Sequence, residues 1–143
     1  MRYLSSRTCV LLPSLACAVV LSSHAAAQTP SWRPVEQQLS RTGIAQPGEV
    51  LRFNFPRTDL RVTLDGVQIR PNLVLRSWVS FKRLASGQAM IMGDLVLTDD
   101  EINPVISALQ QGGVEQTALH NHLVSGSPTT MNLHIGAQGP RQR

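Results

Sequence analysis

The sequence predicts an α+β fold, in which a small, mostly antiparallel sheet carries one main helix packed on one face. Three observations predict this class. Segments that alternate polar and apolar residues, typical of half-buried strands, lie on both sides of a single strong helix pattern. An Asp65-Gly66 pair between two such segments indicates a tight hairpin. The C-terminal half therefore reads strand, helix, strand, strand, an order that places the helix over one face of the sheet.

Residues 1–27 have the pattern of a secretory signal peptide. Arg2 and Arg7 supply the positive region, and residues 10–21 form an apolar region that is too short to span a bilayer. Ala25-Ala26-Ala27 is a cleavage site of the usual small-residue type. We therefore expect cleavage after Ala27, a periplasmic or secreted protein, and no membrane span in the mature form.

The composition of the mature chain limits its chemistry. Both cysteines, Cys9 and Cys17, fall in the expected signal peptide. A metal ion would consequently have to be bound by nitrogen and oxygen ligands. Removing Arg2 and Arg7 from the 13 Lys and Arg residues leaves 11, against 9 acidic residues. Since no basic stripe remains, we expect no nucleic-acid binding.

The mature chain is long enough for one small domain with one core. We expect residues 28–48 to be a flexible lead-in with a short helix over residues 35–41. Residues 49–136 form the expected domain, and residues 137–143 a disordered tail. Within the domain, alternation predicts strands at residues 49–55, 60–64, 67–69, 77–84 and 88–97, with a loop at residues 70–75. The Asp65-Gly66 turn suits type I′ geometry.

The helix pattern begins at Thr98 and Glu101, which form a capping box. Apolar residues then follow at helical spacing, namely Ile102, Val105, Ile106 and Leu109. Gly112 or Gly113 is expected to end the helix. Pro104 conflicts with this pattern, because proline inside a helix costs about 3 kcal/mol. Either the helix continues through Pro104 with a kink, or a shorter helix begins there.

Three histidines form the most informative motif. They lie in two segments, residues 117–123 and 131–135, separated by a stretch with Gly126 and Pro128 that predicts a turn. Alternate side chains of a strand share one face. Pairing His120 with His134 places His120, His122 and His134 on one face, together with Ala118 and Asn132. The other face is then almost entirely apolar.

This cluster leads to a metal hypothesis. Three imidazoles on one face could bind zinc or another divalent transition metal, with a coordination position left open. Asp94 and Glu101 are the candidate oxygen ligands or general bases. We expect a bulge at Gly93 to turn Asp94 toward the site, and Glu115 to lie on the other face. No reaction is assigned by this pattern.

The same residues allow a different function. Histidines and asparagines on a polar sheet face can form a hydrogen-bond network without a metal. The alternative is a non-catalytic module that binds a ligand or dimerises. Joint replacement of His120 and His134 by glutamine distinguishes the two, because only the metal site requires both.

From about Glu49 onward, the chain resembles the LppY/LpqO family of exported bacterial proteins. The matching residues lie at 56–60, 62–67, 77–78, 117–122 and 131–135, and the closest block runs from Met92 to Val105. The resemblance implies an exported protein of unknown function.

The chain departs from that family in two ways. The family commonly carries two copies of this unit, and its His-Ile stretch usually runs on into a long helix, whereas residues 136–143 follow here. We therefore expect a single-copy or C-terminally truncated member. A sheet face left exposed in this way favours self-association or pairing with a second copy of the domain.

Overall fold

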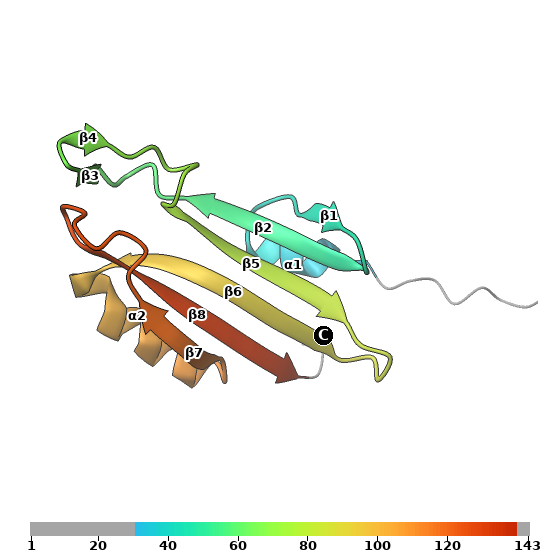
Figure 1. Ribbon diagram of the computed structural model, residues 1–143. Coiled ribbons are helices and arrows are strands. Elements are labelled where there is room, and N and C mark those ends of the chain that lie inside the picture. Colours follow the sequence, from blue (N-terminus) through green and yellow to red (C-terminus); the bar gives the residue numbers. More distant parts are fainter. Residues whose placement is uncertain (1–30, 140–143) are drawn as a thin grey trace, which may run out of the picture. The chain divides into compact units, whose positions relative to one another are not determined.

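A six-stranded antiparallel sheet dominates the part of the chain that the computed structural model describes, residues 31–139 (Figure 1). The strand order is β1-β2-β5-β6-β8-β7. The strands are β1 (Ile44–Gln46), β2 (Val50–Pro56), β5 (Arg76–Arg83), β6 (Ala89–Thr98), β7 (Glu115–His120) and β8 (Thr130–Gly139). A separate hairpin pairs β3 (Thr63–Leu64) with β4 (Val67–Gln68). The predicted α+β class is confirmed; the expected signal peptide lies outside the described residues.

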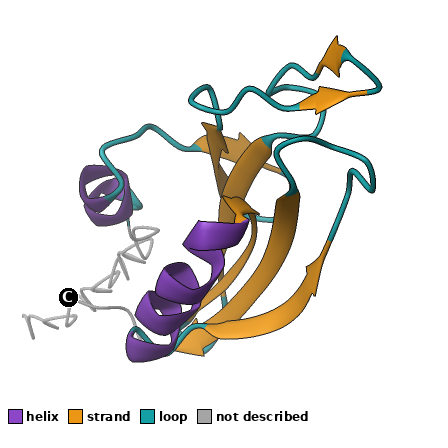
Figure 2. Cartoon of the chain, turned by 90° about the vertical axis from the view of Figure 1, so that its left-hand side faces the viewer, coloured by secondary structure: helices purple, strands orange, loops and turns teal. Residues whose placement is uncertain are grey.

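Both helices lie on the same side of the sheet (Figure 2). The longer one, α2 (Asp99–Gln111), packs its stripe of Ile102, Val105, Ile106 and Leu109 against the buried residues Leu97, Leu133 and Ile135. The shorter one, α1 (Arg33–Gln38), follows Trp32, whose ring lies 5.9 Å from that of Phe81. None of the described helices has the length and apolar character needed to cross a membrane. We call this side of the sheet the helix face.

The longer of the two helix alternatives is the one that forms. Thr98 is the N-cap of α2, and its backbone amide donates a hydrogen bond to Glu101 Oε2 at 2.9 Å. Pro104 lies inside the helix, and Gly112 caps its C-terminus. Gly113 follows with φ +72°, a conformation that costs glycine little. The apolar stripe therefore overrides the cost of proline.

The β3–β4 hairpin confirms the predicted turn, although its strands are shorter than expected. Asp65 and Gly66 both have positive φ, 50° and 79°, as type I′ geometry requires. The neighbouring loops bury Val62 and Leu75 against Val96 of β6. Val96 shares a strand face with Asp94, so these loops cover one end of the face opposite the helices. We call the remainder of that side the open face.

The structure extends two of the expected boundaries. Within the expected lead-in, β1 pairs with β2 through Ala45 and Leu51. At the other end, β8 runs three residues past the boundary expected at residue 136, because residues 137–139 continue to pair with residues 89–91 of β6. Residues 140–143 lie outside the described part of the chain.

Candidate metal site

The three histidines come together on the open face. His120 is the last residue of β7, His134 lies within β8, and His122 is two residues beyond β7. The Nε2 atoms of His120 and His122 are 3.0 Å apart. The ring centroids of His120 and His134 are 4.8 Å apart. One ligand atom from each of the three rings lies within 4.8 Å of the other two. The expected cluster is therefore formed, with a geometry that could hold a metal ion.

The strand register differs from the one that we expected. His120 pairs with Asn132, and His134 pairs with Ala118, so the expectation that His120 faces His134 is wrong. The reason lies in the connection between β7 and β8. Ser127 exchanges two backbone hydrogen bonds with Thr63 of β3, of 2.8 and 2.9 Å, so the connection pairs with β3 rather than extending the hairpin. The shift is two residues, so it leaves the faces unchanged and makes His120 and His134 diagonal neighbours.

Asp94 lies beside the cluster. It is directly opposite His134 in the register of β6 and β8, and its residue is only 8% exposed. Its Oδ1 accepts a hydrogen bond from Asn132 Nδ2 at 2.9 Å, and its Oδ2 lies 3.8 Å from His134 Nε2. That nitrogen is buried and has no hydrogen-bond partner among the described residues. The carboxylate is thus held by an amide and faces an imidazole.

The sequence placed Asn132 on the histidine face, as a member of a hydrogen-bond network, but did not indicate its partner. The structure makes it the residue that fixes Asp94, from a position that is 3% exposed. The available signal was its place two residues before His134, on the same face of the strand. Its partner could not be read from the sequence, because β6 and β8 are separated by the whole of α2 and β7.

The bulge expected at Gly93 is absent. Gly93 pairs regularly with Val79 on one side and Ile135 on the other. Glycine is needed there for space, since a Cβ would lie 2.8 Å from the carbonyl oxygen of Trp78. The irregularity lies in β7 instead, between Gln116 and Ala118. It pairs Glu115 with Gly136, so the register places Glu115 with the histidines rather than on the opposite face as expected.

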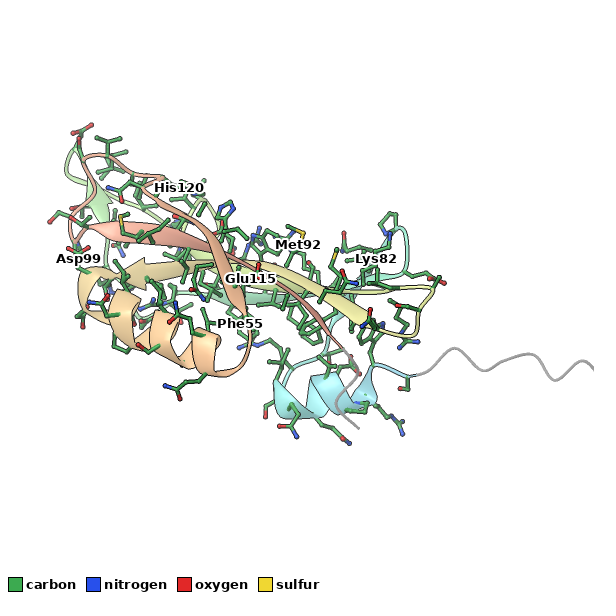
Figure 3. The ribbon with its side chains drawn as sticks, turned by 90° about the horizontal axis from the view of Figure 1, so that it is seen from below. Phe55, Lys82, Met92, Asp99, Glu115 and His120 are labelled. Atoms are coloured by element: carbon green, nitrogen blue, oxygen red, sulfur yellow. The ribbon has the colours of Figure 1, made fainter. Side chains whose placement is uncertain are left out.

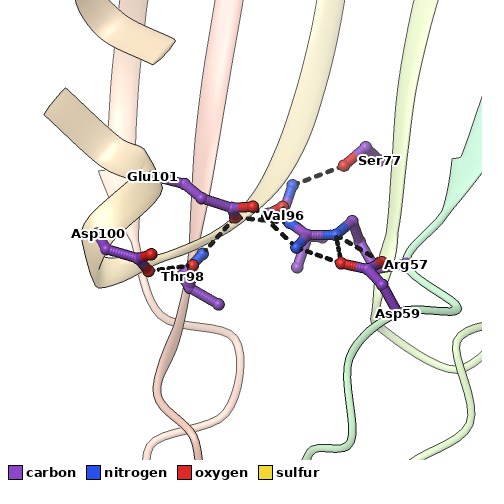
Figure 4. Close-up of polar contacts among 7 residues, drawn as sticks. All are labelled: Arg57, Asp59, Ser77, Val96, Thr98, Asp100 and Glu101. Carbon is purple, nitrogen blue, oxygen red and sulfur yellow. Dashed lines mark hydrogen bonds and ion pairs between the residues drawn. The ribbon is translucent and has the colours of Figure 1, made fainter. Parts of the chain in front are cut away.

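Glu101 stands apart from the histidines, at the start of α2 (Figure 4). Arg57 Nη1 donates to Glu101 Oε2 at 2.7 Å, and Nη2 donates to Oε1 at 3.0 Å. These hydrogen bonds from Arg57 lower the pKa of Glu101. Arg57 also bonds Asp59 and the carbonyl oxygen of Val96. Of the two candidate acids, the structure therefore brings only Asp94 to the histidines. Glu101 instead pairs with Arg57 and so links α2 to the segment after β2. We call the Arg57–Glu101 pair the clamp.

The histidines lie on an exposed sheet face rather than in a cleft. Figure 3 shows His120, Met92 and Lys82 on the side of the sheet away from both helices. Two shallow surface hollows lie elsewhere. One is lined by residues 110, 113–116 and the other by residues 33, 36, 37 and 40–42. Neither includes a histidine. His122 is exposed, and His120 and His134 are partly exposed, so solvent reaches the cluster.

Comparison with protein families gives one match. Residues 33–143 match the family described as Domain of Unknown Function (DUF1259). Searches of curated proteins and of solved structures gave no match. The match includes α1 and β1, which precede the region of the LppY/LpqO resemblance; that resemblance and export stay predictions. Because the match covers most of the sequence, the chain belongs to the DUF1259 family.

Proposed function

We propose that this protein binds a divalent transition metal ion, zinc in the first instance, through His120, His122 and His134. The observation that carries the proposal is the convergence of three imidazole nitrogens within 4.8 Å of one another. In a tetrahedral zinc site with Zn–N bonds of about 2.0–2.1 Å, ligand atoms lie roughly 3.3–3.4 Å apart. The separation of 3.0 Å between His120 and His122 Nε2 is already close to that value. Small side-chain rotations would bring in the third ring.

The choice of metal follows from the ligands. The described residues contain no cysteine, and imidazole suits zinc, copper, iron and nickel. Three protein ligands leave a coordination position for water or a substrate, as in catalytic zinc sites. Asp94 supports this arrangement, since metal-bound histidines usually donate their second ring N–H to a carboxylate or carbonyl. Its Oδ2 lies 3.8 Å from His134 Nε2, so a small movement would complete that contact.

Metal binding can be tested directly. Residues 28–143 are produced without an affinity tag, and bound metal is measured by mass spectrometry and zinc titration calorimetry. The wild type should bind about one zinc ion, and the His120→Gln/His134→Gln variant should bind none. Asn121→Gln is the matched control, because Asn121 lies between His120 and His122 but outside the cluster. Absence of binding to folded wild-type protein, or equal binding by the double variant, would overturn the proposal.

A second candidate function is self-association through the open face. Met90 and Met92 of β6 favour it, because they are 36% and 53% exposed on the same side as the histidines. Sedimentation of the wild type and of Met92→Lys tests this candidate. A concentration-dependent dimer that the substitution weakens supports it, and a monomer at all concentrations contradicts it.

We also propose that the protein is exported to the periplasm or out of the cell. This localisation rests on the signal-peptide pattern of residues 1–27, which lie outside the described part of the chain. Amino-terminal sequencing of the exported product should begin at Gln28. A product that retains Met1 and stays in the cytoplasm would refute this assignment.

A further inference from the structure

An arginine is held in place on the open face, on the far side of Asp94 from the histidines. The guanidinium carbon of Arg52 lies 4.1 Å from the ring centroid of Trp78. Arg52 Nε donates a hydrogen bond to Asn54 Oδ1 at 3.3 Å. Within residues 31–139, the two Nη atoms have no hydrogen-bond partner. Stacking and the Nε contact thus orient the guanidinium and leave its paired donors available.

The surroundings of Arg52 carry an excess of positive charge. By strand alternation, the open face of β2 and β5 holds Arg52, Arg76 and Lys82, and that of β6 holds one carboxylate, Asp94. Burial and the charge of Arg76 lower the pKa of Arg52, and only Asp94 opposes them. No carboxylate of the described residues forms an ion pair with Arg52 or Arg76. An anion from solution would supply the missing partner.

The register connects this arginine to the histidines. Trp78, Asp94 and His134 are direct neighbours on β5, β6 and β8. Because neighbouring strands are about 4.7–4.9 Å apart, the backbones of β5 and β8 that carry the indole and the imidazole are separated by roughly 10 Å. The oxygens of Asp94 point to groups other than Arg52, Oδ1 to Asn132 and Oδ2 to His134. A small molecule lying across Asp94 would therefore reach both ends.

We propose that Arg52, stacked on Trp78, forms an anion subsite for the ligand of the histidine centre. The ligand class is a small organic acid. Its carboxylate or phosphate group accepts two parallel hydrogen bonds from the Arg52 guanidinium, the bidentate geometry that arginine favours. A second donor group of the same molecule reaches the metal ion. The metal contact rests on the proposed function, whereas the arginine contact does not.

The arginine contact is tested first on metal-free protein. Inorganic phosphate and glutarate, a five-carbon dicarboxylate, are titrated while the indole N–H signal of Trp78 is followed by NMR. Saturable shifts at Trp78 are expected, with affinity at least 10-fold weaker in Arg52→Gln and partly restored in Arg52→Lys. Arg33→Gln on α1 is the matched control and should bind as the wild type does. No saturable shift, or wild-type affinity in Arg52→Gln, overturns the subsite.

The bridging contact is tested with zinc added. Glutarate should then bind at least 10-fold more tightly, and this gain should vanish in the His120→Gln/His134→Gln variant. If zinc binds but leaves the affinity for glutarate unchanged, bridging is wrong. If zinc does not bind while both anions still bind at Arg52, the subsite is supported and the metal proposal fails. The two failures are thus told apart, and circular dichroism of each variant shows that it is folded.

Discussion

The clamp between Arg57 and Glu101 gives a stability prediction whose size can be worked out from exposure. The Arg57 side chain is 16% exposed, and that of Glu101 is 36% exposed. Exposed pairs contribute about 0–1 kcal/mol, whereas removing one partner of a fully buried pair costs about 3–5 kcal/mol. This pair lies between those limits, and solvent reaches its carboxylate. We expect Glu101→Gln to lower the free energy of unfolding by about 1–2 kcal/mol.

A matched control lies on the same guanidinium. Asp59 Oδ2 is 2.7 Å from Arg57 Nη2, the same distance as the shorter Glu101 contact, but the Asp59 side chain is 62% exposed. Water therefore replaces the Asp59 contact at little cost in folding free energy. This holds even though the side-chain hydrogen bonds with Asp59 are the largest cause of the raised pKa of Arg57. Asp59→Asn should cost less than about 1 kcal/mol in urea unfolding at pH 7.

The pH dependence of the clamp has a definite sign. Hydrogen bonds from Arg57 lower the pKa of Glu101 below its ordinary value of 4.5. A carboxyl group with a lowered folded-state pKa contributes stability above its unfolded pKa and loses it as the pH falls through the folded value. The difference between wild type and Glu101→Gln should be complete at pH 7 and shrink below pH 4.5. An equal difference at pH 7 and pH 3, or an Asp59→Asn cost as large as that of Glu101→Gln, would refute this reasoning.

Three further predictions concern the sheet. Gly93→Ala should destabilise the protein by about 1–3 kcal/mol in urea unfolding, because the added Cβ would meet a backbone oxygen at 2.8 Å; Gly136→Ala, where the nearest atom would be 3.6 Å away, should cost clearly less. Leu133→Ala should cost about 2–5 kcal/mol, because Leu133 is fully buried under α2; a cost below 1 kcal/mol would contradict the packing. Asp94→Asn should weaken zinc binding by about 10–100-fold in calorimetry, and an unchanged affinity would exclude its role at the metal.

The elements that the sequence predicted well are those specified by neighbouring residues. The helix start at Thr98 and Glu101 and the turn at Asp65 and Gly66 depend on contacts within a few residues. The sequence alone does not decide whether the helix runs through Pro104, because the cost of an internal proline opposes the apolar stripe. The deciding contribution is the packing of that stripe on β6 and β8, which comes from distant segments.

The candidate site was predictable in composition but not in register. Strand alternation placed all three histidines on one face, and a shift of two residues preserves such a face. The connection between β7 and β8 pairs through Ser127 with Thr63, 64 residues away, and a contact at that separation leaves no local signal in the sequence. Nor could the sequence pair Arg52 with Trp78, since each is a single residue in a segment that reads simply as a half-buried strand.

The site and the main core use opposite faces of one sheet, and this separation has an energetic consequence. Substitutions of His120 and His134 remove little buried apolar surface, so their effect on metal binding can be measured in a folded protein.

The open face nevertheless buries the carboxylate of Asp94 against one amide and one imidazole. Burial of a carboxylate is costly unless its partners offset that cost. A cation bound beside His134 would add favourable interaction, and a ligand that binds only the folded state raises its stability by about 2.7 kcal/mol at 100 times its Kd. Zinc should therefore raise the Tm of the wild type and of Asn121→Gln, but not that of His120→Gln/His134→Gln. An equal rise in all three would show that zinc stabilises the fold at some other place.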